Sequence, residues 1–159
     1  LGHLCGGMLL SALLGSYAGF LTMIGVLILS HGNLSKGLVH SAKMVGGVYH
    51  GAARLSLTPG TDPEEFTETV KSQIRKLDKG YGVLILTDIR GGTPFFSACR
   101  SLADCNSAIV TGANLGMVTE ALLSNDDYDD LREFAQVVCE AGKATISTIF
   151  EVNGGNNSD

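Results

Sequence analysis

The stretches that decide the fold are LILSH at Leu27–His31 and LILTD at Leu84–Asp88. Each is an apolar run without alternation, which is typical of a strand buried on both faces of a parallel sheet. In each stretch the apolar residues are followed by a small hydroxyl residue, Ser30 or Thr87, and then by a side chain that can take part in catalysis, His31 or Asp88. The two runs therefore predict a buried parallel sheet that delivers His31 and Asp88 to one edge.

Strand and helix patterns alternate outward from these two runs. Apolar runs predict strands, and apolar stripes at spacings of three and four predict helices. This alternation predicts a doubly wound, three-layer α/β/α fold around a mostly parallel sheet. The expected strands are residues 24–30, 52–57, 82–87, 107–111 and 145–152, and the expected helices are 35–46, 62–77, 93–103, 116–123 and 126–141.

Three of the expected helices begin at residues that commonly cap helices. Asp62 followed by Pro63 is the strongest of these starts, because an aspartate cap and a proline at the first helical position both favour a helix. Ser35 and Thr93 are the predicted caps of two other helices.

The composition excludes several classes of protein. The 159 residues carry a formal net charge of −5, with 45% hydrophobic and 17% charged residues, which indicates a packed domain rather than a disordered chain. An acidic balance without clustered Lys or Arg argues against nucleic acid as a partner. The four cysteines form no Cys-x-x-Cys pair, so we expect reduced thiols rather than a disulfide scaffold, zinc ribbon or redox motif.

The first 22 residues contain no Lys, Arg, Asp or Glu. A signal peptide needs a basic start, and a membrane span needs about 20 mostly apolar residues, whereas this run carries several glycines and two serines. We favour an added leader or an early start before Met23. The expected organisation is an extraneous leader at 1–22, one domain at 23–152 and a polar tail at 153–159.

His31 and Asp88 occupy matching positions after the two deciding runs. If the strands are parallel neighbours paired in register, their backbones lie about 4.8 Å apart and the two side chains emerge side by side. Taken alone, each residue is more often structural than catalytic. Their joint placement favours function, as an imidazole oriented by a carboxylate.

The loop Gly91-Gly92-Thr93 follows directly and precedes an expected helix. Backbone N–H groups before a helix can face an anion, and the helix dipole favours negative charge there. A simple tight turn explains the loop alone equally well. Beside His31 and Asp88, the loop predicts chemistry on a phosphoryl or carboxylate group. The sequence has no Walker A motif, dinucleotide fingerprint or apparent metal cluster, so we expect no cofactor and no metal.

Four further residues are candidates for lining the site: Ser30, Gly32, Arg90 and Asn114. Ser30 and Gly32 flank His31. Arg90 could equally stay in solvent or reach a phosphate, and Asn114 follows the fourth expected strand, where it more often shapes a loop.

Three segments carry a family resemblance: MIGVLILSHG at Met23–Gly32, LTDIRGGTPF at Leu86–Phe95 and GANL at Gly112–Leu115. In order and spacing they resemble the IIA component of the mannose family of the bacterial phosphoenolpyruvate-dependent sugar phosphotransferase system, over essentially all of residues 23–150. The Asp-x-x-Gly-Gly-Ser/Thr-Pro segment is the most specific part of the match. A strand-terminal His-Gly alone would be a weak signal.

The resemblance implies a cytoplasmic phosphotransferase that carries a phosphoryl group. The phosphocarrier protein HPr would phosphorylate Nε2 of His31, which would pass the group to a IIB component while the membrane components IIC and IID carry the sugar. Asp88 would accept from Nδ1–H and fix the tautomer. Gly91, Gly92 and Thr93 would bind the phosphoryl oxygens. No metal or nucleotide is required, because the donor is already a phosphohistidine.

The resemblance also implies a homodimer and a sheet order of 2-1-3-4. In that dimer the strand at 145–152 would lie antiparallel at the edge of the partner's sheet. Arg90 stands where a family member can carry an aromatic residue, which would alter partner docking. Gly116 stands where family members often have proline, which would loosen that loop.

Three rival interpretations stay open at this point. A histidine phosphatase also places His-Gly after its first strand, but it needs an arginine directly before the histidine, where this chain has Ser30. The phosphotransfer subunit of dihydroxyacetone kinase tends toward His-Ser where this chain has His31-Gly32. A regulatory domain without phosphotransfer is disfavoured by the intact His31 and Asp88.

Overall fold

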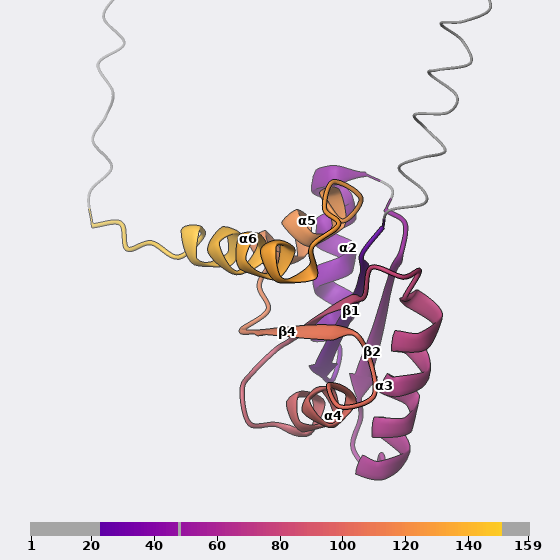
Figure 1. The fold of residues 1–159 in the computed structure, drawn as a ribbon. Coiled ribbons are helices and arrows are strands. Elements are labelled where there is room, and N and C mark those ends of the chain that lie inside the picture. The colour runs from indigo at the N-terminus through magenta and orange to yellow at the C-terminus, as the bar shows by residue number, and fades with distance from the viewer. Residues whose placement is uncertain (1–22, 48, 151–159) are drawn as a thin grey trace, which may run out of the picture.

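Strands and helices alternate along the residues that the computed structural model describes, 23–47 and 49–150 (Figure 1). The elements are β1 (Gly25–His31), α2 (Leu34–Gly46), β2 (Ala52–Leu57), α3 (Pro63–Leu77), β3 (Val83–Thr87), α4 (Thr93–Ser101), β4 (Ser107–Thr111), α5 (Leu115–Leu123) and α6 (Leu131–Ala144). The expected leader at 1–22 and tail at 153–159 lie outside these residues. Within them, none of the helices combines the length and the apolar character needed to cross a membrane.

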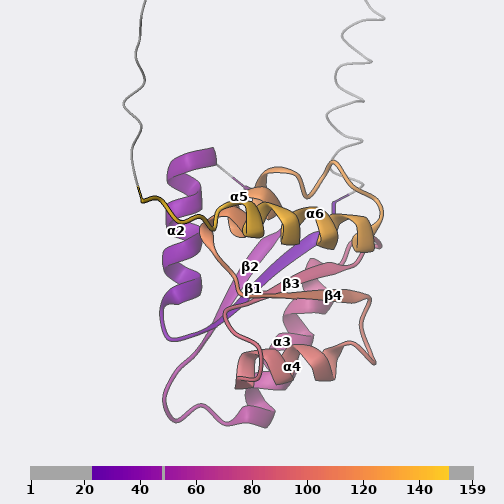
Figure 2. The same cartoon turned by 90° about the vertical axis from the view of Figure 1, so that its left-hand side faces the viewer.

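The four strands form one parallel sheet in the order β2-β1-β3-β4, which confirms the expected architecture. β1 and β3 occupy the centre, and every residue of Gly25–Ser30 and Val83–Thr87 is buried. Burial on both faces explains why these runs do not alternate with polar residues. Figure 2 shows the layers, with α2, α5 and α6 on one side of the sheet and α3 and α4 on the other.

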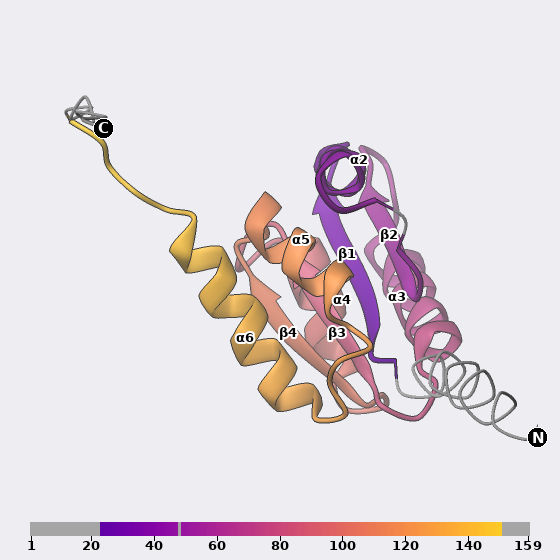
Figure 3. The ribbon, with the colours of Figure 1, turned by 90° about the horizontal axis from the view of Figure 1, so that it is seen from above.

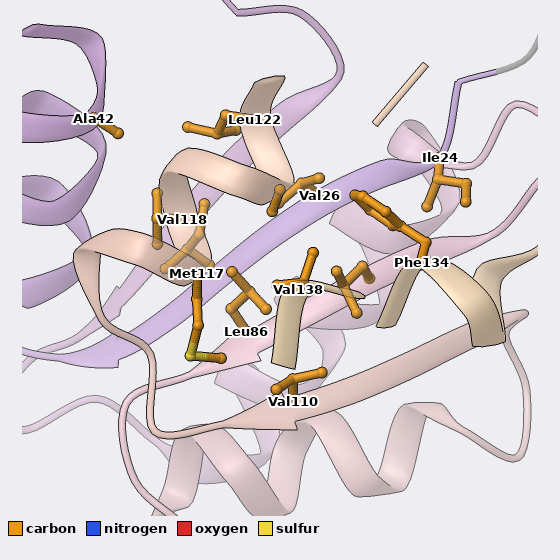
Figure 4. Packing of buried hydrophobic residues seen from close by; sticks show 13 residues of the cluster. Ile24, Val26, Ala42, Leu86, Val110, Met117, Val118, Leu122, Phe134 and Val138 are labelled. Carbon is orange, nitrogen blue, oxygen red and sulfur yellow. The ribbon is translucent and has the colours of Figure 1, made fainter. Parts of the chain in front are cut away.

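Alternate residues of the central strands enter two separate cores, because successive side chains point to opposite faces. On one face Val26, Ile28, Leu84 and Leu86 pack with side chains of α2, α5 and α6, among them the fully buried Phe134 and Val138 (Figure 4). On the other face Leu27, Leu29, Val83 and Ile85 pack with Phe66, Val70 and Ile74 of α3 and with Ala98 of α4. His31 continues the face of Leu27 and Leu29, so its side chain emerges on the side of α4.

The register between β1 and β3 differs from the expectation by one residue. Leu27 pairs with Ile85 rather than with Leu84, and Leu29 pairs with Thr87. Both runs are apolar on both faces, so a shift of one residue buries just as much apolar surface, and the sequence does not specify it. Continuing the ladder places the backbone of Asp88 beside Ser30, one residue before His31.

The helix starts confirm one predicted cap and correct two. Asp62 caps α3, where its Oδ1 accepts two N–H groups of the first turn at 2.9 Å each. Ser35 lies inside α2, whose N-cap is Asn33 with no capping bond from its side chain. Thr93 is the first residue of α4, whose N-cap is Gly92.

The last helix begins later than residue 126, the expected start. Asp130 caps α6, and its Oδ1 accepts from the N–H groups of Arg132 at 2.7 Å and Glu133 at 3.0 Å. The segment 126–130 holds four aspartates, each of a type that favours caps. The sequence pattern therefore identified the helix but not the aspartate at which it starts.

Residues 145–150 form no strand within the single chain, so the expected strand at 145–152 is not seen there, and its exchange onto a partner's sheet stays a prediction. This segment leads away from the end of α6 (Figure 3). Its apolar side chains are among the most exposed in the described chain: Ile146 at 77%, Ile149 at 75% and Phe150 at 91%. A strand needs a partner edge, and within one chain this segment reaches none. Residues 151 and 152 lie outside the described residues.

Gly116 does not stand in a loosened loop, as its departure from the family pattern suggested. It lies in the first turn of α5, packed closely against the end of α6. A Cβ at this position would lie 3.2 Å from the carbonyl oxygen of Ala141 and would overlap the side chain of Thr145. The glycine therefore permits a close contact between two helices.

Candidate functional site

His31 and Asp88 meet at the carboxyl edge of the sheet. Nδ1 of His31 lies 2.9 Å from Oδ2 of Asp88, and the His31 backbone N–H donates to the same oxygen at 2.7 Å. The Asp88 side chain is 5% exposed, whereas that of His31 is 46% exposed. A carboxylate only accepts, so this geometry assigns the proton to Nδ1 and leaves the lone pair of Nε2 available.

Asp88 is held as a carboxylate by the groups around it. Burial alone would raise its pKa, but hydrogen bonds from the backbone and ring of His31 and from the Ile89 N–H lower the pKa below the usual aspartate value. The Ile89 N–H donates to Oδ1 at 2.9 Å, so both carboxylate oxygens are engaged. A charged, fixed carboxylate beside Nδ1 favours any state in which the imidazole becomes positively charged.

The backbone of Gly92 lies against the imidazole of His31. A Cβ at Gly92 would come within 2.9 Å of Nε2, closer than real Cβ contacts. Gly92 has an ordinary extended conformation, with φ −86° and ψ 170°, so space beside His31, not backbone geometry, requires glycine here. Gly91 is the opposite case: its φ of +99° favours glycine, and a Cβ there would meet no atom within 4 Å.

The N-terminus of α4 is left without a side-chain cap beside Nε2. Gly92 is its N-cap and has no side chain to offer, and Pro94 has no N–H. The N–H groups of Thr93 and Phe95 belong to the first turn, where a helix provides no carbonyl partner. Backbone donors and the positive end of the helix dipole therefore face the same space as the Nε2 lone pair, an arrangement suited to an anion.

The turn from β1 to α2 fixes the backbone on either side of His31. Gly32 has a φ of +53° and donates its N–H to the Leu57 carbonyl of β2 at 2.8 Å. Ser30 is 1% exposed, and its hydroxyl accepts the Ser35 N–H at 2.8 Å. Gly32 is therefore exposed at the edge of the site. Ser30 is buried and binds the start of α2 instead of lining the site.

Arg90 and Asn114 have different placements. Arg90 is exposed in the loop after Asp88 and forms no salt bridge among the described residues. Asn114 caps α5, with its Oδ1 accepting the Met117 N–H at 3.0 Å. Asn114 therefore serves as a helix cap, a role that neither expectation named, and its hydrogen bonds within the described residues go to Met117 and Gly142 rather than to His31.

Sequence reasoning missed how two serines, Ser35 and Ser56, hold the turn that follows His31. Ser35 is fully buried, and its Oγ lies 3.1 Å from Oγ of Ser56 and 3.4 Å from the carbonyl oxygen of Leu55, both on β2. The spacing Ser30-x-x-x-x-Ser35 was visible in the sequence. The role of Ser56 was not, because it depends on the pairing of β1 with β2.

The described residues hold no group of three or more His, Cys, Asp or Glu arranged for a metal ion. The groups that converge at this edge are instead one oriented imidazole, one charged carboxylate and several backbone donors. Together they can make Nε2 a nucleophile and stabilise an anionic group attached to it.

The fold and the site define a doubly wound α/β protein with a histidine–aspartate pair at the carboxyl edge of its sheet. The family model described as "PTS system fructose IIA component" matches residues 25–138, more than half of the chain. The chain therefore belongs to the fructose/mannose-type IIA family of the bacterial sugar phosphotransferase system (PTS), which confirms the resemblance.

Individual relatives agree with this assignment. The "PTS system mannose-specific EIIAB component" of Escherichia coli (strain K12) is 30% identical over 127 residues, covering 79% of this chain and 39% of the relative. The solved mannose/sorbose-specific IIA subunit from Enterococcus faecalis matches with a TM-score of 0.72 and 25% identity, covering 80% of this chain and 95% of that one. The PTS IIA protein associated with the fucose utilization operon of Streptococcus pneumoniae gives 0.68 and 32%, over 79% and 93%.

The chain spans 39% of the length of the first curated relatives that it matches. Membership of the family rests on the segment that is present, residues 25–138.

Proposed function

We propose that the chain is a phosphocarrier that accepts a phosphoryl group on Nε2 of His31 and passes it to a second protein. One observation carries the proposal: Nδ1 of His31 is bound to Asp88 at 2.9 Å while Nε2 lies beside Gly92, at the open N-terminus of α4. Nε2 is therefore the ring nitrogen that can act as the nucleophile, and backbone donors at the start of α4 stand where negative charge would arrive.

The donor we propose is the phosphohistidine of HPr, and the acceptor is a IIB component. The lone pair of Nε2 attacks phosphorus, an N–P bond forms on His31, and the N–P bond of the donor breaks with its electron pair returning to the donor imidazole. The proton on Nδ1 of His31 stays between that nitrogen and Asp88. Transfer to IIB repeats the step in the other direction, so no metal, nucleotide or other co-reactant is consumed.

Asp88 supports this step in two ways. It binds Nδ1–H, so that in the neutral ring the lone pair lies on Nε2, and it stabilises the positive charge that the ring gains when phosphorus bonds to Nε2. Its pKa is lowered by hydrogen bonds from His31 and Ile89 despite the burial that raises it, so the carboxylate stays charged at neutral pH.

The loop after Asp88 would hold the phosphoryl group. Charge in phosphoryl transfer is spread over the non-bridging oxygens, and fixed backbone donors stabilise such charge well. Gly91, Gly92 and Thr93 can supply N–H groups, Thr93 can add its hydroxyl, and the exposed Arg90 can approach from the rim. Gly32 would leave the opposite side of the ring uncovered.

We further propose a cytoplasmic homodimer whose working domain is 23–152. An open groove of about 530 Å³ runs between the edge strand β4 and α6. The exposed Ile146, Ile149 and Phe150 suit an interface with a second copy better than water. Segment 145–152 of one protomer would add a strand along β4 of its partner. IIC and IID would be reached only indirectly, through IIB.

The proposal is tested with purified enzyme I, HPr and labelled phosphoenolpyruvate. The full chain should gain a phosphoryl group that is labile in acid and stable in base, as expected of a phosphohistidine, and should lose it again on addition of a IIB component. His31→Ala should gain none. Labelling of His31→Ala at the parent's level would assign the phosphoryl group to another residue and overturn the proposal.

A further inference from the structure

We propose that Ser30, Ser35 and Ser56 form a positioning device that aims the imidazole of His31, in a role that rests on the phosphocarrier function proposed above. The three serines come from β1, α2 and β2, and their hydroxyl groups connect the two sides of the turn that carries His31 to a neighbouring strand. None of them touches the reacting atoms. They act through the backbone of His31.

The first link joins the residue before His31 to the helix after it. Oγ of Ser30 accepts the N–H of Ser35 at 2.8 Å, and both residues are buried, at 1% and 0% exposure. Ser35 is the second residue of α2, so its N–H has no carbonyl partner in the helix. Asn33 at the N-cap makes no side-chain bond, which leaves this work to Ser30.

The second link ties that helix start to β2. Oγ of Ser35 lies 3.1 Å from Oγ of Ser56 and 3.4 Å from the Leu55 carbonyl oxygen. A backbone bond from the Gly32 N–H to the Leu57 carbonyl, at 2.8 Å, completes the attachment. The turn is therefore bound to β2 at two points, and one of them depends on the serine hydroxyls.

Beyond the last ladder pair of β1 and β2, which joins His31 to Leu57, the turn has few contacts of its own. Gly32, Asn33 and Leu34 are all exposed, and Gly32 has the left-handed conformation that only glycine adopts readily. Buried packing therefore cannot fix the position of His31 from this side. The serine contacts provide the restraint that the exposed residues lack.

The position of this backbone matters because Asp88 binds His31 twice through one oxygen. Oδ2 accepts both the backbone N–H at 2.7 Å and the ring Nδ1–H at 2.9 Å. A small displacement of the turn lengthens both bonds together and turns the ring away from the loop. Misplacement by about 1 Å can cost about a hundredfold in rate, so the serines should affect transfer more than stability.

Ser35→Ala tests the device against Ser101→Ala as a matched control. Ser101 is also fully buried, in α4, and its hydroxyl donates to the Ser97 carbonyl at 2.9 Å, away from the His31 turn. Each variant removes one buried hydroxyl and keeps the helix. Phosphoryl uptake is measured with phospho-HPr over a range of concentrations, and the protonation of the His31 ring nitrogens is read from long-range proton–nitrogen NMR spectra of the unphosphorylated protein.

We expect Ser35→Ala to lower the rate at saturating phospho-HPr about tenfold with little change in KM, while Ser101→Ala stays near the parent. The NMR spectrum of Ser35→Ala should lose the single Nδ1–H form of His31. Ser56→Ala, at a half-buried position, should give the same changes more weakly, and it replaces Ser35→Ala if that variant does not fold.

Equal rates and equal spectra for Ser35→Ala, Ser56→Ala and Ser101→Ala would show that the serines only satisfy buried hydrogen bonds, and would overturn the proposal. If the parent itself takes up no phosphoryl group, the phosphocarrier function fails. The NMR comparison still decides the positioning role in that case, because it needs no phosphoryl donor.

Discussion

Two strand-to-helix turns meet at His31, and they are built in opposite ways. The turn from β1 to α2 is closed by hydrogen bonds to its own strand and to β2. The turn from β3 to α4 contains Gly91 and Gly92 and leads into a helix that no side chain caps. One turn holds the nucleophile in place, and the other keeps its donors available for an anion.

The residues just before the two site residues show the same contrast. Ser30 precedes His31 and caps the second N–H of α2 with its hydroxyl. Thr87 precedes Asp88, but its buried hydroxyl has no hydrogen-bond partner among the described residues. The second residue of α4 is Pro94, which has no N–H to give. The equivalent capping bond therefore cannot form in the second turn.

The helices that begin away from His31 are capped differently from the two that begin beside it. α3, α5 and α6 are each capped by their own N-cap side chain, from Asp62, Asn114 and Asp130. Among the described helices, the two without such a cap are α2 and α4, which border His31. In α2 the hydroxyl of Ser30 takes the place of the missing cap, so of these two helix starts that of α4 keeps its N–H groups for an anion such as a phosphoryl group.

Asp88→Asn should have the largest effect on the comparison, because it removes the charge that links the two turns. An asparagine can keep the shape but not the negative charge beside Nδ1, so we expect transfer to slow by at least about a hundredfold. The rate of phosphoryl uptake from phospho-HPr checks this. An unchanged rate would remove Asp88 from the mechanism.

Unfolding at different pH values gives an independent check on Asp88. Its pKa in the folded protein is lowered, since hydrogen bonds from His31 and Ile89 outweigh the effect of burial, which raises it. A lowered pKa contributes stability that is fully present above the unfolded value of about 3.9 and is lost as the pH falls through the folded value. The free energy of unfolding of the parent should therefore exceed that of Asp88→Asn at pH 7, and the difference should shrink below about pH 4.

Gly92→Ala and Gly91→Ala form a pair that separates space from backbone strain in the open turn. Alanine suits the backbone of Gly92, but its Cβ would press on Nε2 of His31, so transfer should fall about tenfold with a small change in stability. At Gly91 the φ of +99° is strained for alanine, while no atom lies within 4 Å. That variant should lose about 1 kcal/mol of stability and keep more of its transfer rate. Transfer kinetics and urea unfolding of both variants measure the two effects, and a larger transfer loss in Gly91→Ala would contradict this account of Gly92.

The two turns also show which structural features can be predicted from the sequence alone. The runs before His31 and Asp88 predicted the central strands, because short continuous apolar runs are typical of strands buried on both faces of a parallel sheet. The same property hid the register, since Leu27 can face Leu84 or Ile85 with equal burial. Adjacent motifs such as Asp62-Pro63 predict a cap locally.

Features that depend on contacts between distant segments could not be predicted from the sequence. Ser35 looked like a cap because serine before an apolar stripe often is one, and its actual partner, Ser56, lies 21 residues along the chain, where only the fold places it. The closeness of Gly92 to the imidazole likewise depends on the path of the loop from β3. Residues 145–150 have the pattern of a strand but form none within the single chain, because a strand needs a neighbouring edge and this segment leads away from the end of α6 (Figure 3).

Asp62→Ala should have the smallest effect on transfer and therefore defines what a capped helix contributes. Its Oδ1 accepts two N–H groups of α3, so the variant should lose about 1 kcal/mol in the free energy of unfolding. Its contacts in the structure lie at the start of α3 and not at His31, so phosphoryl transfer at a temperature well below unfolding should stay at the parent's rate. The expected loss of stability resembles that of Gly91→Ala. Comparing the transfer rates of Asp62→Ala and Gly91→Ala therefore tests whether destabilisation alone slows transfer. Slow transfer by Asp62→Ala would show that loss of stability alone lowers the rate. The difference between the β1–α2 turn and the β3–α4 turn would then reflect stability rather than the chemistry of the site.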